Sequence, residues 1–250
     1  MLEIFPIPAF QDNYIWMLSQ DGHATVVDPG DATPVLITLK KNNLTLDSIL
    51  ITHHHSDHIG GVQPLYDQYQ CQIFAPANNA YHFPNQSVHD GDIILLKHLN
   101  IDLQVIEVPG HTLDHIAYYG TNSLFCGDTL FSAGCGRLFE GSPQQMYDSL
   151  KKLASLPADT GVYCTHEYTQ HNIKFAMQFD PENQDLIAYS NKVNALRLSG
   201  KPSLPSSIDT EKKINPFLRC DSDAIKHKLG MENMQPLDVF SKLRMMRNHY

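Results

Sequence analysis

Residues 52–61 read THHHSDHIGG and place four histidines and one carboxylate within ten positions. The run SILI at 48–51 directly precedes them and predicts a buried strand, so the histidines emerge at the carboxyl end of that strand, where α/β folds bind ligands. Imidazole and carboxylate groups with no thiolate beside them suit zinc, iron or manganese. A surface histidine run or a purification tag is the alternative interpretation, but a tag would lie at a terminus and would lack the strand. The stretch therefore predicts a metal site.

Three later strand-like runs, at 103–108, 123–126 and 161–165, each end shortly before a residue type that binds metals. These residues are His111, Asp128 and His166. Together with the first cluster they make seven candidate ligands, enough for two metal ions. One ion would take His53, His55 and His111. The other would take Asp57, His58 and His166, and Asp128 would bridge both ions through its two oxygens.

Two cations lower the pKa of a water held between them from about 15.7 towards neutrality and can also polarise a carbonyl oxygen. The ligand pattern therefore predicts hydrolysis of an acyl or phosphoryl bond by a hydroxide that bridges the metals. Iron in the same ligands would instead permit oxygen chemistry.

The composition bounds the class of protein. A hydrophobic share of 42% and a charged share of 18% in 250 residues are ordinary for a soluble globular protein. Residues 1–6 lack the basic start of an export signal, and there is no sign of a membrane span, so we expect a cytoplasmic protein. Five cysteines without C-x-x-C spacing fit reduced thiols better than disulfides.

The net charge of −9 is unevenly distributed. Residues 1–168 contain 6 Lys and Arg against 18 Asp and Glu, whereas residues 169–250 contain 12 against 9. An acidic first part suits cations, and a mildly basic second part could bind an anionic small molecule. The overall balance argues against a nucleic-acid partner.

The patterns divide the chain at about residue 168. Before it, strands predominate, with helices expected at 33–41, 62–69 and 143–155, the last beginning with a capping box after Ser142. After it, we expect only helices: one capped by Asp180, one at 222–229, and one from Leu237 onward. The buried side of the last helix would carry Leu237, Phe240, Leu243 and Met246. The patterns therefore predict two domains: 1–168, which binds metal, and 169–250, which is helical and could bind an anionic small molecule.

The motifs T-H-x-H-x-D-H, P-G-H-T, G-D-T-L-F and T-H-E-Y-T occur in this order, and the chain resembles the metallo-β-lactamase superfamily. More closely, it resembles the hydroxyacylglutathione hydrolase (glyoxalase II) family. Three further segments carry that closer resemblance: GCGRLFEG at 134–141, NPFLR at 215–219, and Leu243-Arg244. The likeness extends over the whole chain.

The resemblance implies an α/β fold, an αββα sandwich followed by a smaller all-helical C-terminal domain. It also implies two divalent metal ions per chain, zinc before iron or manganese, with Asp57 and Asp128 as catalytic carboxylates through the metals they bind. The implied reaction is hydrolysis of S-lactoylglutathione to D-lactate and glutathione, which removes methylglyoxal. The implied partner is thus a small glutathione thioester, and we expect a monomer.

Positions that bind glutathione in the family carry over to Arg137, Phe139, Tyr168, Arg244 and Arg247. Phe139 stands where some members have tyrosine, and Arg247 where many have lysine. Arg244 and Arg247 are three residues apart on a predicted helix, so they lie side by side and could bind a carboxylate together. The plainer interpretation is that these arginines are solvated surface charges. Asp114 replaces a glycine expected before His115, whose role the sequence leaves open.

Three alternatives remain. A persulfide dioxygenase shares the first histidine motif but uses one iron ion and consumes oxygen. A metallo-β-lactamase would be secreted and would lack the helical C-terminal domain. A metal-binding scaffold protein would show no turnover.

Overall fold

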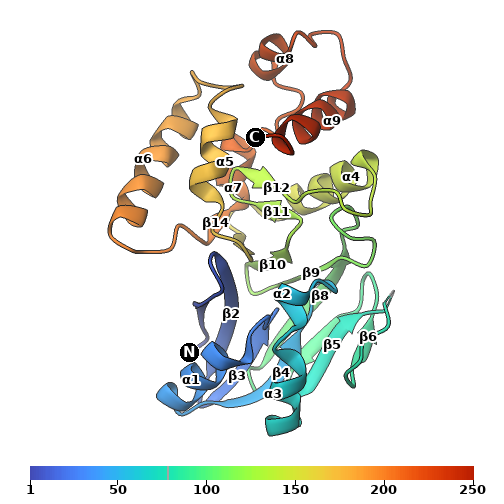
Figure 1. Cartoon of the computed structure of the whole chain (residues 1–250), viewed down its shortest axis with the longest axis vertical. Coiled ribbons are helices and arrows are strands. Elements are labelled where there is room, and N and C mark those ends of the chain that lie inside the picture. The colour runs from blue at the N-terminus through green and yellow to red at the C-terminus, as the bar shows by residue number, and fades with distance from the viewer. Residues whose placement is uncertain (78) are drawn as a thin grey trace. The chain divides into compact units, whose positions relative to one another are not determined.

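The computed structural model describes residues 1–77 and 79–250, and within it the chain forms two compact units. Unit 1 comprises Met1–Glu107 and Asp114–Gly127, and unit 2 comprises Val108–Leu113 and Asp128–Tyr250. Figure 1 labels the elements of both units.

The first sheet of unit 1 has the strand order β1-β2-β3-β4-β5-β6. Its strands are β1 (Glu3–Ala9), β2 (Asn13–Gln20), β3 (His23–Val27), β4 (Thr45–Leu50), β5 (Gln72–Pro76) and β6 (Gln86–Val88). The first three strands pair antiparallel, and β3 to β6 pair parallel. In the parallel register Val27 lies beside Leu50, and both residues end their strands. Asp28 and the histidine stretch therefore leave the sheet at the same edge.

Helices cover one face of this sheet. They are α1 (Ala32–Asn42) and α3 (Val62–Tyr69), with the short α2 (Ser56–Ile59) between β4 and α3. Val35 and Leu39 of α1 and Leu65 of α3 are fully buried in one core cluster with Met17 and Ile49 of the sheet. Burial of such side chains stabilises the layer by about 1.5–3 kcal/mol each.

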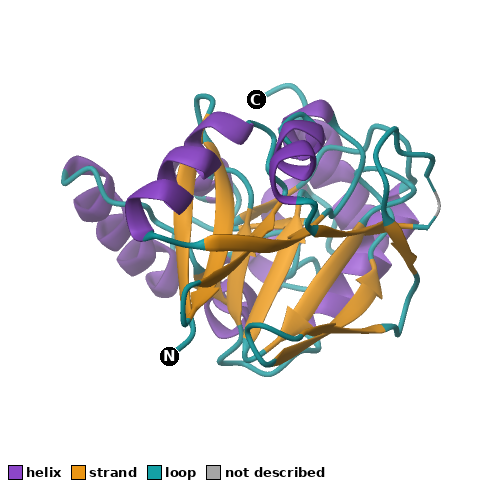
Figure 2. Ribbon diagram, turned by 90° about the horizontal axis from the view of Figure 1, so that it is seen from below, coloured by secondary structure: helices purple, strands orange, loops and turns teal. Residues whose placement is uncertain are grey.

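The second sheet of unit 1 is antiparallel in the order β10-β9-β8-β7. Its strands are β7 (Ile93–Leu96), β8 (Ile101–Glu107), β9 (Ile116–Gly120) and β10 (Ser123–Gly127). The buried Tyr118 hydroxyl of β9 donates to the Ile51 carbonyl at 2.8 Å and approaches the Phe74 carbonyl at 3.3 Å. The two sheets therefore face each other, as the orange strands in Figure 2 illustrate.

Unit 2 is mainly helical. Its strands are β11 (Leu130–Phe131), β12 (Gly134–Cys135), β13 (Gly161–Cys164) and β14 (Ser206–Ser207). Its helices are α4 (Pro143–Ala154), α5 (Thr169–Ala176), α6 (Gln184–Leu198), α7 (Ile208–Ile214), α8 (Asp223–Leu229) and α9 (Pro236–Arg247). The hairpin of β11 and β12 is held from α7, because the Asn215 amide donates to the Phe131 and Gly134 carbonyls. Buried Glu211 accepts from the Ala133 backbone and from Asn215.

The predicted fold class, an α/β sandwich followed by helices, is confirmed, as is the capping box of α4. The predicted cap of α6 is wrong. Its N-cap is Asn183, whose side chain accepts from the backbone of Asp185 and Leu186, while Asp180 is paired with Arg219 and bound by the Asn183 amide.

On α9, Phe240 and Leu243 are buried as expected. Leu237 and Met246 are only half-buried, and Val239 and Arg244 share the buried side instead. The sequence pattern also missed α5 and α7, since apolar periodicity is weak in such short helices.

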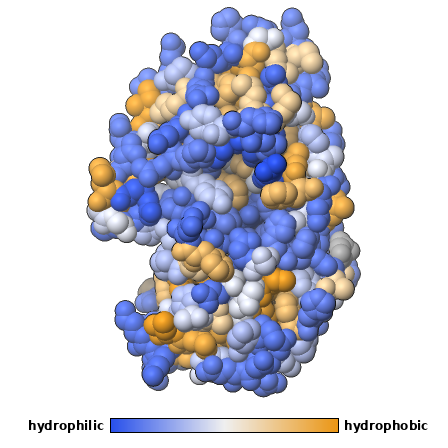
Figure 3. All heavy atoms as spheres, in the orientation of Figure 1, coloured by the Kyte–Doolittle hydropathy of each residue, from blue (hydrophilic) through white to orange (hydrophobic). Residues whose placement is uncertain are grey.

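None of the helices in the described part of the chain is long and apolar enough to cross a membrane. Figure 3 shows that hydrophilic residues cover most of the visible surface, with apolar residues in small separate patches.

The Tyr118 hydroxyl gives the first prediction. Tyr118→Phe removes the partner of the buried Ile51 carbonyl and should lower the midpoint of thermal unfolding by about 2–6 °C. Tyr119→Phe is the matched control, because Tyr119 lies next in β9 and is half-buried. Differential scanning calorimetry measures both variants. Equal shifts would contradict the assigned role of the Tyr118 hydroxyl.

Candidate metal centre

The buried carboxylate of Asp28 organises the histidine stretch of unit 1. Its Oδ1 accepts from the Thr52 backbone at 2.8 Å, and its Oδ2 accepts from the Thr52 hydroxyl at 2.7 Å. The same Oδ2 lies 2.9 Å from Nδ1 of His58. Asp28 follows β3 and Thr52 follows β4, so adjacent parallel strands bring them together. The sequence motifs do not indicate this role of Asp28, although an acidic residue directly after a strand is a usable signal.

The four predicted ligands of unit 1 lie together. Nε2 of His53 and Nδ1 of His55 are 3.1 Å apart, and the His53 and His58 ring centroids are 4.0 Å apart. Nε2 of His58 lies 3.5 Å from Oδ2 of Asp57. His53 and His58 are fully buried, whereas Asp57 is partly exposed.

Neighbouring residues position these ligands. The Asn13 amide donates to Oδ2 of Asp57 at 3.0 Å. Gly30 lies so close to the Asp57 carbonyl that a Cβ would overlap it. The His115 ring stacks on His53 with centroids 4.6 Å apart, which gives His115 a packing role. Asp114, also buried, accepts from Asn79 and Tyr81 and lies 2.9 Å from Nδ1 of His54.

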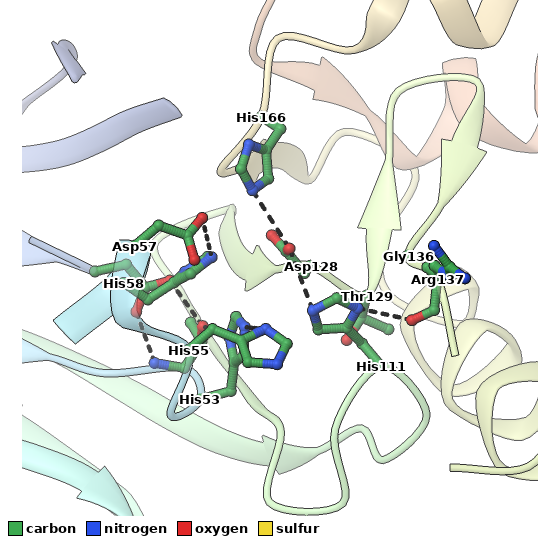
Figure 4. A network of polar contacts seen from close by, with 12 residues as sticks. His53, His55, Asp57, His58, His111, Asp128, Thr129, Gly136, Arg137 and His166 are labelled. Carbon is green, nitrogen blue, oxygen red and sulfur yellow. Dashed lines mark hydrogen bonds and ion pairs between the residues drawn. The ribbon is translucent and has the colours of Figure 1, made fainter. Parts of the chain in front are cut away.

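The other three predicted ligands lie together in unit 2, where Figure 4 shows Asp128 between His111 and His166. Nε2 of each histidine is 3.4 Å from Oδ2 of Asp128, and all three residues are buried. The loops after β8, β10 and β13 carry them. Each unit thus collects its own set of imidazole and carboxylate groups.

The hydrogen bonds of two histidines test whether these sets fit a metal. Nδ1 of His111 donates to the Arg137 carbonyl at 2.7 Å, so in the neutral ring Nε2 carries the lone pair. Nε2 lies 3.4 Å from Oδ2 of Asp128. Both atoms are then acceptors, so a cation between them would satisfy both. His58 repeats the arrangement, with Nδ1 on Asp28 and Nε2 near Asp57.

Two ligands of one tetrahedral zinc ion, each bonded at about 2.0–2.1 Å, lie about 3.3–3.4 Å apart. The donor sets therefore fit divalent cations.

A pocket of about 230 Å³ lies in unit 2. It is lined by Phe131, Cys135, Arg137, Tyr168, Asn172, Arg244, Arg247 and Asn248. Among these described residues three are arginines and none is a carboxylate. Such a lining suits an anionic ligand. Tyr168 stacks on the His166 ring with centroids 4.6 Å apart, so the pocket adjoins the unit 2 ligand set.

The arginines of this pocket have different environments. Arg244 is buried and donates to the Cys135 carbonyl at 2.6 Å and the Gly136 carbonyl at 3.2 Å, so it holds the segment that carries Arg137. Arg247 is half-buried and donates to Asn172. Burial, and then the nearby Arg244, lower the pKa of Arg247, which an anion in the pocket would counteract.

Phe139 occupies a different place from the other predicted substrate residues. Its ring lies edge-on to His111, with centroids 5.2 Å apart, and under the Arg137 guanidinium. It is 60% exposed and is not among the described residues that line the pocket.

The sequence of this chain matches two family models. The model for the metallo-beta-lactamase superfamily matches residues 9–166, and the model for the hydroxyacylglutathione hydrolase C-terminus matches residues 167–250. A hydroxyacylglutathione hydrolase of Methylobacillus flagellatus is 52% identical over 250 residues and is covered completely, as this chain is. The chain belongs to the hydroxyacylglutathione hydrolase family.

Other relatives of this family agree. A hydroxyacylglutathione hydrolase of Nitrosomonas eutropha is 47% identical, with both chains fully covered. Among solved structures, ETHE1 from Myxococcus xanthus has a TM-score of 0.67 at 24% identity. The match covers 99% of this chain and 97% of the ETHE1 chain. This lower similarity establishes the shared fold alone.

Asp28 gives the second prediction. Asp28→Asn keeps the shape of the side chain but weakens its contacts to His58 and Thr52, so metal affinity should fall about 10–100-fold. Asp31→Asn is the matched control, because Asp31 caps α1 and asparagine caps a helix equally well. Competition with a chromophoric chelator measures both affinities. Unchanged affinity in Asp28→Asn would show that Asp28 does not orient the ligands.

Proposed function

We propose that this chain hydrolyses S-(2-hydroxyacyl)glutathione thioesters, chiefly S-lactoylglutathione to D-lactate and glutathione, at a centre of two divalent metal ions. Membership of the family supports the reaction. The observation that carries the proposal is in unit 2, where a cationic pocket adjoins a set of metal ligands through the stacked pair His166 and Tyr168. The cationic pocket would bind the anionic tripeptide, while the adjoining metal ligands would lie near its thioester.

The proposed ligands follow the order of the motifs. His53, His55 and His111 would bind one ion, Asp57, His58 and His166 would bind the other, and Asp128 would bind both. Zinc is the proposed metal, because imidazole and carboxylate ligands suit it, and iron and manganese are the alternatives. The catalytic domain would comprise residues 1–168 and the substrate domain residues 169–250.

When bound, the two ions supply a nucleophile from water at neutral pH and polarise the thioester carbonyl. Asp57 and Asp128 would act by holding the ions. The carbonyl of Arg137 fixes the orientation of the His111 ring, whose Nε2 would bind one of them. The leaving sulfur needs little help from a general acid, since an ordinary thiol has a pKa of about 8.5. Burial raises the pKa of the Cys135 thiol, which argues against a cysteine nucleophile in the pocket.

The lining of the pocket supports a proposal for which residues bind each part of the substrate. Arg247 and Arg137 would bind the carboxylates of the tripeptide, and Tyr168 would bind beside the thioester. Arg244 is chiefly a positioning residue, because its guanidinium already donates to two backbone carbonyls. Phe139 would contact substrate only at the edge of the site.

A persulfide dioxygenase is the main rival, since it shares the first histidine motif. The match of residues 167–250 to the hydroxyacylglutathione hydrolase C-terminus favours the hydrolase. The five cysteines are all buried and none forms a disulfide bond, which supports the further proposal of a cytoplasmic location. The monomeric state also stays a prediction.

Metal content and thioester hydrolysis, measured on one purified sample, test the proposed function. The saturated protein should hold two ions per chain and hydrolyse S-lactoylglutathione without consuming oxygen. Asp128→Ala should lose both ions and lower kcat/KM by more than the roughly 100-fold that loss of an outer-shell partner can cause. Asp148→Ala on the exposed face of α4 is the matched control. One ion per chain at saturation would overturn the binuclear centre, and hydrolysis that survives complete metal removal would overturn the function.

Arg247 gives the fourth prediction. Arg247→Ala removes a charged donor from the pocket, so KM for S-lactoylglutathione should rise about 10–100-fold. KM for a simple thioester without glutathione should stay the same. Lys242→Ala is the matched control, because Lys242 is an exposed cation on the same helix. If both substrates are affected equally, Arg247 supports folding and does not bind the tripeptide.

A further inference from the structure

A second group of histidine and carboxylate side chains lies elsewhere in unit 1. His23 begins β3, Asp47 lies in β4, and His98 lies in the turn between β7 and β8. Nδ1 of His23 is 2.9 Å from Oδ2 of Asp47, and Nε2 of His98 is 3.7 Å from Oδ1 of the same carboxylate. The two imidazole rings stack with centroids 4.5 Å apart and planes inclined by 20°. Three metal-binding groups from both sheets therefore converge.

This group is separate from the candidate metal centre. His23 lies beside Thr45 at the start of the parallel pair β3 and β4, whereas Asp28 and Thr52 follow the opposite ends of these strands. His23 and Asp28 are five positions apart along an extended strand, which corresponds to about 16 Å. A metal ion bound by His23, Asp47 and His98 would therefore not contact the residues of the proposed catalytic site.

The geometry suits one small cation. The three ligand atoms all lie within 4.8 Å of one another. Around a tetrahedral ion with bonds of about 2.0–2.1 Å they would lie about 3.3–3.4 Å apart. The His98 ring, now stacked on His23, would have to rotate so that its Nε2 lone pair points towards the ion. His98 can supply most of this movement, because its side chain is 57% exposed and belongs to a turn.

Two of the three groups border open space. Asp47 and His98 line a hollow of about 140 Å³, whose other lining residues are Thr25, Ser48, Gln72, Leu95, Leu96, Lys97 and Leu99. His89 and Asp92 form a simpler pair for comparison, with Nδ1 and Oδ2 3.7 Å apart and both side chains well exposed.

We propose that His23, Asp47 and His98 form an additional metal site, which binds one transition-metal dication such as Zn²⁺, Ni²⁺ or Cu²⁺ with water completing the coordination. Two imidazoles and one carboxylate favour these ions over Mg²⁺ and Ca²⁺, which prefer oxygen ligands. The bound ion connects β3 and β4 of the first sheet with the β7–β8 turn of the second. It therefore stabilises the folded form of unit 1, because the unfolded chain does not bring the three ligands together.

Titration of the full-length, metal-loaded protein with Cu²⁺ or Zn²⁺ alone tests this site. After equilibrium dialysis, elemental analysis should find one more ion per chain in the unchanged protein than in His98→Ala. Asp47→Asn should show the same deficit, and His89→Ala should show none. The comparison is a difference between variants, so it does not depend on how many ions the catalytic centre holds. Its outcome is thus distinguishable from a failure of the proposed function.

Two further readouts identify the ligands. The electron paramagnetic resonance spectrum of the additional Cu²⁺ in the unchanged protein should show coupling to two nitrogens, and this signal should be absent from His98→Ala. Added Zn²⁺ should raise the unfolding midpoint of the unchanged protein more than that of His98→Ala. Equal metal content in the unchanged protein and His98→Ala at millimolar Cu²⁺ would overturn the proposal, as would an equal loss of metal in His89→Ala.

Discussion

The arrangement of the candidate metal ligands in unit 1 depends on the hydrogen bonds of the buried Asp28 carboxylate. Its backbone N–H donates to the Leu50 carbonyl, and its side chain binds Thr52 and His58. The ends of β3 and β4 and the start of the histidine loop are therefore connected through one residue. A buried carboxylate is costly without such partners, so this arrangement is stable only when the strands and the loop are all in place.

A comparable constraint acts in unit 2. The hairpin of β11 and β12 is held by Glu211 and Asn215 of the α7 region and by Arg244 of α9. The segment after this hairpin supplies both the Arg137 carbonyl for His111 and the Arg137 side chain for the pocket. The C-terminal helices thus orient His111, a proposed metal ligand, as well as one wall of the arginine-lined pocket. Burial raises the pKa of Glu211, and its hydrogen bonds to Ala133 and Asn215 oppose this effect.

The uneven charge of the chain matches this division of chemistry. Residues 1–168, which are strongly acidic, contain all seven proposed metal ligands, and the carboxylates among them would offset the charge of bound cations. Residues 169–250, which are mildly basic, contribute Arg244 and Arg247 to a pocket suited to an anion. Attraction between opposite charges thus accounts for the preference of the first part for metal cations and of the second part for an anion.

The sequence alone determined the fold class, most strands, the capping box of α4 and the seven candidate ligands, because alternation, capping residues and dense histidine motifs are local signals. It did not reveal Asp28, Asn13 or Asn172, whose partners lie 24 or more residues away along the chain. It also did not distinguish buried Arg244 from half-buried Arg247, since helical spacing places both on one side without showing what packs against them. His23, Asp47 and His98 likewise carry no shared motif. Only the packing of two sheets brings them together, because contacts between distant segments depend on tertiary structure and leave no periodic pattern in the chain.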